Sequence, residues 1–135
     1  SVMALKYKEI LVSAMSGGTT DVVGLIPQYS IPIALGIRVI AAIVNGGSAE
    51  SIASIGTIND TNSFLDTSGG NPVTLSTAGQ NAVLPYVPAS AATQQDGGGI
   101  FNQANSDLRI THSASLTAGE VRICLWYYKL TPPQS

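Results

Sequence analysis

Residues 121–130, with the sequence VRICLWYYKL, are apolar on both faces of a predicted β-strand. Side chains of a strand alternate between the two faces of its sheet. One face would carry Val121, Ile123, Leu125 and Tyr127, and the other would carry Arg122, Cys124, Trp126, Tyr128 and Leu130. The first set can line a core, but the second set needs a cover as well. The segment therefore predicts a strand whose outer face is buried by other subunits.

A second segment, residues 37–44, repeats this two-sided pattern. Ile37, Val39, Ala41 and Ile43 alternate with Arg38, Ile40, Ala42 and Val44. Trp and Tyr side chains can each bury about 150–250 Å², so leaving them exposed beside aliphatic residues would create an unusually large patch for a monomer. We therefore predict a subunit interface that contains Ile40, Val44, Trp126 and Tyr128. The alternative is a cover from the same chain, supplied by the opposite sheet and a long loop at about 89–105.

Turn residues recur at short intervals along the chain. Gly, Pro and Asn-Asp turns separate short runs of Ile, Val, Leu and Tyr, which is typical of a β-sandwich or barrel. We predict strands at residues 7–14, 21–26, 37–44, 52–58, 73–75, 82–87, 108–115 and 121–130. The first segment also fits a short helix. The 135 residues should form one all-β domain, an antiparallel β-sandwich, in which about 1–18 could be an N-terminal arm.

The last two predicted strands form the clearest local unit. Leu108, Ile110 and His112 alternate with polar residues, and Leu116-Thr117-Ala118-Gly119 then turns the chain into the strand that begins at Val121. This pattern predicts a β-hairpin in which the glycine supplies a positive φ.

Composition argues against several classes of partner. The chain has a net charge of −2, and its six Lys and Arg residues are scattered, so we expect no nucleic-acid partner. The longest apolar run, residues 31–44, is shorter than the 18 to 20 residues that span a bilayer, so we expect no membrane partner and predict no targeting segment. The single cysteine, Cys124, forms no intrachain disulfide and no zinc site by itself.

Few residues have the chemistry of a catalytic or metal site. His112 is the only histidine, and its alternation with Leu108 and Ile110 points it toward the core. A nucleophile and base pair of Cys124 and His112 is conceivable across a hairpin, but an inert buried thiol is much more common. We therefore predict no catalytic, cofactor-binding or metal residues, no cofactor, and no enzymatic activity.

One acidic loop has oxygen ligands that suit calcium. It contains Asn59, Asp60, Asn62 and Asp66. Its spacing differs from that of an EF-hand, because Phe64 stands where an oxygen ligand is required and no glycine follows. A loop whose polar side chains cap its own backbone is the favoured interpretation.

Several short motifs resemble those of a group of small virion proteins of tailed double-stranded-DNA bacteriophages. They are Asp107-Leu108-Arg109-Ile110-Thr111, Leu116-Thr117-Ala118-Gly119-Glu120-Val121-Arg122-Ile123, Trp126-Tyr127-Tyr128, Leu25-Ile26-Pro27, the run 36–44, Ile55-Gly56-Thr57, Asn59-Asp60 and Phe64-Leu65. The similarity spans about 21–130 with the order of elements kept. Glu120 departs from the basic residue that is usual at its position in the group.

The resemblance implies a jelly-roll-like β-sandwich that assembles on a capsid or fibre, often as a trimer, and it implies no catalytic residues. We expect a capsid decoration or cement protein, a homotrimer that binds the major capsid protein on the capsid surface of the virion and is made in the cytoplasm of the bacterial host. The alternative is a tail fibre or spike tip that binds a host glycan or receptor through exposed aromatic residues and Asn/Asp loops.

Overall fold

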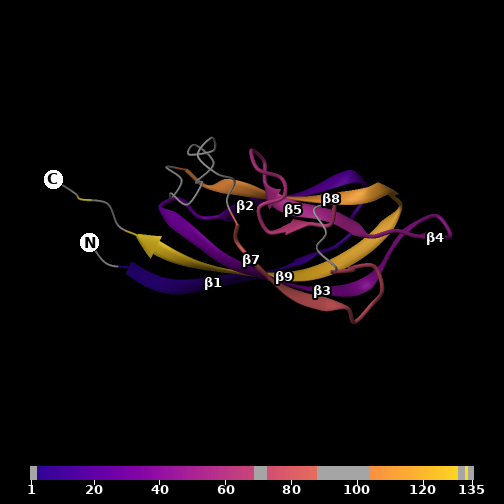
Figure 1. The fold of residues 1–135 in the computed structure, drawn as a ribbon, viewed down its shortest axis with the longest axis horizontal. Coiled ribbons are helices and arrows are strands. Elements are labelled where there is room, and N and C mark those ends of the chain that lie inside the picture. The colour runs from indigo at the N-terminus through magenta and orange to yellow at the C-terminus, as the bar shows by residue number, and fades with distance from the viewer. Residues whose placement is uncertain (1–2, 69–72, 88–103, 131–132, 134–135) are drawn as a thin grey trace.

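The computed structural model describes residues 3–68, 73–87, 104–130 and 133, and these residues fold into two facing β-sheets (Figure 1). The strands are β1 (Met3–Val12), β2 (Gly17–Ile26), β3 (Ser30–Asn45), β4 (Ser48–Ala49), β5 (Ile52–Thr57), β6 (Leu65–Asp66), β7 (Asn81–Pro85), β8 (Ser106–Leu116) and β9 (Ala118–Leu130). Every strand pair is antiparallel. The prediction of an all-β antiparallel sandwich is confirmed.

Each sheet is built from strands that are distant in the sequence. The first sheet has the order β1-β9-β3, and β3 also pairs with β4 at one end and with β7 further along. The second sheet has the order β2-β8-β5-β6. Consecutive long strands therefore lie in different sheets, β1 opposite β2 and β8 opposite β9, as Figure 1 shows. No helix long and apolar enough to cross a membrane occurs among the described residues.

The core lies between the sheets and is made by the predicted alternation. Val121, Ile123 and Leu125 of β9 are 0% exposed, and their inward side chains are in register with apolar residues of β3. The second sheet contributes Ile55, Leu108 and Ile110, which are also fully buried. Removing this much aliphatic surface from water is the main favourable term in folding.

The predicted hairpin of the last two strands is wrong. β8 pairs with β2 and β5, whereas β9 pairs with β1 and β3, so the turn carries the chain from one sheet to the other. The crossing begins at Thr117, whose backbone N–H already donates to the carbonyl of Val44 in the first sheet at 2.9 Å. Gly119 has no positive φ; it is buried, and a Cβ there would lie 3.3 Å from Ile43.

The predicted strand at 73–75 is also wrong. The end of this segment makes single hydrogen bonds to both sheets, because Leu75 accepts from Ile52 at 3.1 Å and Ser76 accepts from Ile43 at 2.9 Å. Leu75 itself is fully buried. The apolar side chain belongs to the core, but its backbone closes one end of the sandwich instead of extending a sheet.

The N-terminal segment forms a strand and not a helix. β1 pairs with β9 in one continuous register from Met3↔Leu130 to Val12↔Val121, so much of the stretch considered as an arm belongs to the first sheet. β3 begins at Ser30, earlier than predicted, because a register shift between Pro32 and Ala34 lets a proline enter the strand. The long loop predicted at about 89–105 lies almost entirely outside the described residues.

Candidate interaction surface

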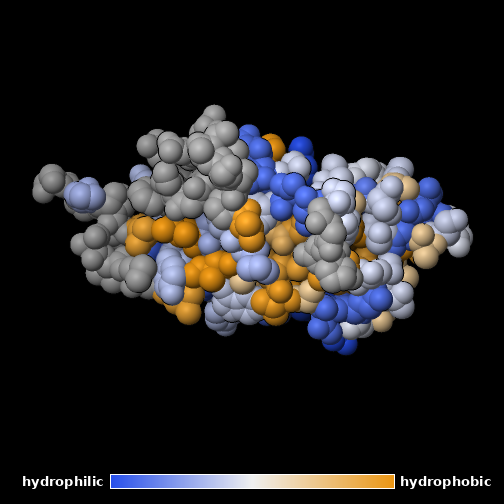
Figure 2. Space-filling model, in the orientation of Figure 1, coloured by the Kyte–Doolittle hydropathy of each residue, from blue (hydrophilic) through white to orange (hydrophobic). Residues whose placement is uncertain are grey.

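The outer face of the first sheet is largely apolar, and we call it the apolar face. It consists of Leu5, Tyr7, Glu9 and Leu11 of β1, Arg122, Cys124, Trp126 and Tyr128 of β9, Ala34, Gly36 and Arg38 of β3, and Val83 of β7. Leu5, Tyr7 and Val83 are 62%, 67% and 69% exposed. Figure 2 shows apolar residues gathered across the middle and lower left of the view, where β1, β7 and β9 run.

The outer face of the second sheet is mostly polar, although Val23 of β2 is an exposed apolar residue. Its side chains include Thr19 and Asp21 of β2, Arg109, Thr111 and Ser113 of β8, and Ser54 of β5. Arg109 donates to both carboxylate oxygens of Asp21 at 2.8 and 2.9 Å, and these hydrogen bonds lower the pKa of Asp21 below its ordinary value. The two outer faces therefore differ in chemistry, and only the first has the composition of a surface that partners bury.

Trp126 lies near the middle of the apolar face. Its register partners are Tyr7 on β1 and Ala34 on β3. The six-membered ring of the indole covers Gly36, where an added Cβ would come within 2.9 Å of two ring carbons. The glycine makes room for the indole, which is half-buried within its own chain. Trp126 is thus held against the sheet and presents its remaining surface to solvent.

The structure separates the four residues of the predicted interface into two pairs. Tyr128 is next to Trp126 on the same face, in register with Leu5. Ile40, which is 37% exposed, lies six residues along β3 from the partner of Trp126, which is about 20 Å at 3.3 Å per residue. Val44 is further still. The interface role of all four residues stays a prediction, but they do not form one continuous cluster.

The sequence argument missed the part of the apolar face on β1. Leu5 and Tyr7 alternate with Lys6 and Lys8, and Leu11 falls on the same face as Leu5 and Tyr7. This alternation was the available signal. The same segment also fits a short helix, so its local pattern alone does not identify this face.

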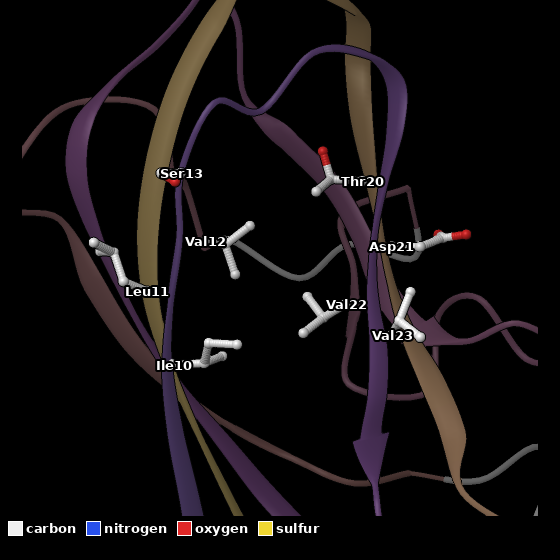
Figure 3. Close-up of a pocket in the computed structure, with 8 residues that line it drawn as sticks. All are labelled: Ile10, Leu11, Val12, Ser13, Thr20, Asp21, Val22 and Val23. Carbon is white, nitrogen blue, oxygen red and sulfur yellow. The ribbon is translucent and has the colours of Figure 1, made fainter.

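The free edge of β1 faces the neighbouring edge of β2 across an open groove of about 320 Å³. Figure 3 shows Ile10 and Val12 pointing from β1, and Val22 from β2, into this groove, while Leu11 points away. Further along β1, Lys8 lies on the side that faces the second sheet and donates to the carbonyl of Gly24 at 3.5 Å. Inward-pointing charges are a common device against strand addition at a sheet edge. Partners are therefore better accommodated on the apolar face than along this edge.

The only histidine and the only cysteine lie on different sheets. His112 is 6% exposed; its Nε2 is 3.0 Å from the hydroxyl of Thr20, and its Nδ1 is 2.7 Å from the carbonyl of Gly17. Cys124 is on the outer face of the first sheet, where burial and the nearby charge of Glu9 raise the pKa of its thiol. The prediction that His112 faces the core is confirmed. The two side chains are not brought together as a nucleophile and base.

No protein-family model matches the chain, and no curated protein matches it in sequence. Two phage capsid structures share its fold. A chain of the cyanophage Pam1 capsid asymmetric unit has a TM-score of 0.55 and 12% identity, and the match covers 95% of this chain and 85% of that chain. A chain of the Ralstonia phage GP4 capsid has a TM-score of 0.54 and 14% identity, with 96% and 86% covered. At these identities the similarity shows the fold alone.

The acidic loop after β5 is organised by its own hydrogen bonds. The carbonyl of Asp60 accepts from the backbone of Thr57 at 3.0 Å and from Ser63 at 3.3 Å. The carboxylate of Asp66 accepts from Asn62 at 3.1 Å and from the hydroxyl of Ser68 at 2.7 Å. Among the described residues there is no group of three or more His, Cys, Asp or Glu side chains that could hold a metal ion.

Proposed function

We propose that this chain is a structural protein of a bacteriophage virion, a decoration or cement protein that sits on the capsid surface and binds the major capsid protein. The observation that carries this proposal is the apolar face, an exposed sheet surface on a fold shared with chains of two phage capsid structures. The sequence motifs described above point to the same class of protein. Synthesis in the cytoplasm of the bacterial host follows from this class.

The strand order supports a jelly roll. One sheet has the strand order β1-β9-β3-β7, and the other has the order β2-β8-β5-β6. The chain therefore alternates between the sheets as two interleaved Greek keys do. Jelly rolls recur in viral capsid proteins and also in lectins and cupins. The fold alone therefore does not distinguish these functions, and the chemistry of the exposed faces has to do so.

The proposed role works through buried area. Three strands about ten residues long and the five-residue β7, spaced about 4.8 Å apart, present about 550 Å² of sheet surface. Covering that surface on both partners removes about 1,100 Å² from water, just above the roughly 1,000 Å² that a specific interface needs. A protein that buries such a surface across the boundary between capsid subunits adds association free energy that opposes the internal pressure of packaged DNA.

The same apolar surface supports self-association, and we propose a homotrimer. Closed symmetry lets each copy bury part of the surface without forming an open filament. In this proposal the pair Ile40 and Val44 and the pair Trp126 and Tyr128 are two separate contact regions, one of which is available for the other copies and one for the capsid.

We further propose that the protein is not an enzyme and needs no cofactor. Supporting this, the imidazole of His112 is engaged by Thr20 and Gly17 in the second sheet, whereas the thiol of Cys124 is on the outer face of the first sheet. The net charge of −2 and the scattered cations support the absence of a nucleic-acid partner, and the proposal includes no membrane partner.

A second candidate function is a fibre or spike tip that binds a host glycan. One observation favours it: Tyr7 and Trp126 are cross-strand neighbours, and Tyr7 is 67% exposed. Aromatic faces of this kind can stack on sugar rings as well as anchor a protein interface.

Copy number separates the two functions. We expect purified particles to contain this chain in an amount of the same order as the major capsid protein, measured by quantitative gel densitometry. A cement protein covers the shell, whereas a tip occurs only at the ends of fibres. An amount far below that of the capsid protein would overturn the decoration proposal and favour the tip. Analytical ultracentrifugation of the isolated protein tests the trimer, and a single 13.9 kDa species would contradict it.

A further inference from the structure

Two arginines stand directly opposite each other on the two central strands of the first sheet. Arg38 of β3 and Arg122 of β9 are register partners, and both side chains are exposed on the apolar face. Directly opposed residues of an antiparallel pair have Cβ atoms about 4.5–5.5 Å apart. Like charges at that separation repel each other and destabilise the sheet, so their presence needs an explanation.

Neither arginine forms an ion pair among the described residues, although Glu9 of β1 and Glu120 of β9 lie on the same face. The ion pair found in the described part of the chain joins Arg109 and Asp21 on the other sheet. The remaining register neighbours of the pair are Leu11 on β1 and Asn81 on β7, and the amide nitrogen of Asn81 donates to the carbonyl of Gly79 at 3.2 Å. The two guanidinium groups therefore keep their donors available for a partner.

The arginines stand at a shallow groove of about 280 Å³ in the apolar face. Gly36 contributes no side chain to it, while Val83 and Cys124, the register partners of Gly36, lie on either side. Glu9 also lines the groove, but its register partner is Cys124, and its charge raises the pKa of that thiol. Apart from Glu9 and Asn81, the groove has a cationic end and apolar walls, which suits an acidic side chain presented by a largely apolar surface.

We propose that Arg38 and Arg122 together bind a carboxylate, an Asp or Glu side chain of the capsid protein that covers the apolar face. Guanidinium groups match a carboxylate through paired N–H donors, and such charge-assisted hydrogen bonds strengthen when a docked partner excludes water. The ion pair with the partner also relieves the repulsion between the two arginines. This inference rests on the proposed function and names the chemistry of its contact.

A protein carboxylate fits the surroundings better than a nucleic-acid phosphate. The arginines are flanked by Leu11 and Val83 and not by further cations. Phosphate backbones are bound by stripes of Lys and Arg, and this chain has only six such residues.

The test measures binding of the purified protein to phage particles that lack it, with Arg38→Gln, Arg122→Gln and the double variant Arg38→Glu/Arg122→Glu. We expect about tenfold or weaker binding for each Gln variant and a greater loss for the double variant, because one charge-assisted contact is worth about a factor of ten or more. Binding of the wild type should weaken with rising NaCl, and the double variant should lose this dependence. Lys6→Gln is the control for the two Gln variants, because it removes one positive charge as they do but lies on the opposite side of the first sheet.

Thermal melting separates this role from a structural one. Removing one of two opposed arginines should leave the melting temperature at or above that of the wild type, so binding falls while stability does not. Gln variants that melt lower and bind in proportion to their folded fraction would contradict the proposal, as would Gln variants that bind as well as the wild type.

Other outcomes distinguish this inference from the proposed function. If the wild type itself does not bind particles, the decoration function fails. If the wild type binds and all arginine variants bind equally well, the decoration function stands and the carboxylate contact is wrong. Arginine-dependent binding of a double-stranded DNA oligonucleotide, or arginine-dependent dimerisation without particles, would identify a different partner and overturn the proposal.

Discussion

Replacing Gly56 with alanine is expected to destabilise the fold more than any other single methyl addition considered. An added Cβ at Gly56 would lie 2.1 Å from the carbonyl oxygen of Asp60 and 2.5 Å from the carbonyl carbon of Thr61. Both are backbone atoms, so no side-chain rotation relieves the clash. The loop would have to lift off β5, losing the 3.0 Å hydrogen bond between Thr57 and Asp60.

That loss would extend into the core. The loop leads into Phe64, which is 4% exposed, donates to the carbonyl of Ile55 at 2.8 Å and packs on Tyr86 with ring centroids 5.1 Å apart. We expect the free energy of unfolding to fall by about 3 kcal/mol or more, a large part of the stability of a domain this size.

Urea denaturation followed by circular dichroism measures this change. Gly47→Ala is the matched control, because a Cβ there meets nothing within 4 Å and the residue has no positive φ. The control should unfold at nearly the wild-type urea concentration. If Gly56→Ala did so too, the loop would not rest on β5 as described.

Replacing Trp126 with glutamate should detach the protein from its partners without unfolding it. Less than half of Trp126 is left uncovered by its own chain, about 80 Å² or less, which is worth about 2 kcal/mol when a partner buries it. A carboxylate placed in that dry contact adds several kcal/mol of desolvation cost. Together these terms predict at least a hundredfold weaker oligomerisation or capsid attachment.

Circular dichroism and particle binding are the two measurements for this variant. The chain should stay soluble and β-rich, because Trp126 is on the outer face and the core beneath it is unchanged. Ser115→Glu on the polar second sheet introduces the same side chain at an exposed position and should bind normally. A Trp126→Glu protein that remains oligomeric and attached would show that the indole is only an exposed surface residue.

The sequence predicted the elements of this fold better than their pairing. The two-sided alternation of β9 identified both faces correctly, because strand geometry alone sends Val121 and Trp126 to opposite sides. The same argument placed His112 in the interior. Turn residues likewise predicted a reversal near Gly119.

Pairing depends on contacts between distant segments, which local pattern does not encode. A chain reversal at 116–119 is compatible with a hairpin and with a crossing between sheets. In the structure, the backbone hydrogen bond from Thr117 to Val44 of β3 ties the turn to the first sheet, so the chain crosses. The candidate surface shows the same limitation. The opposition of Arg38 and Arg122, and the distance of Ile40 from Trp126, both depend on the register of β3 with β9.

Heat-induced release of DNA from particles with and without this protein tests the central claim most directly. Particles that lack the chain should assemble but release their DNA at a lower temperature, and adding back the purified wild type should restore the release temperature. Identical release curves for particles with and without the protein would contradict a reinforcing role in the shell.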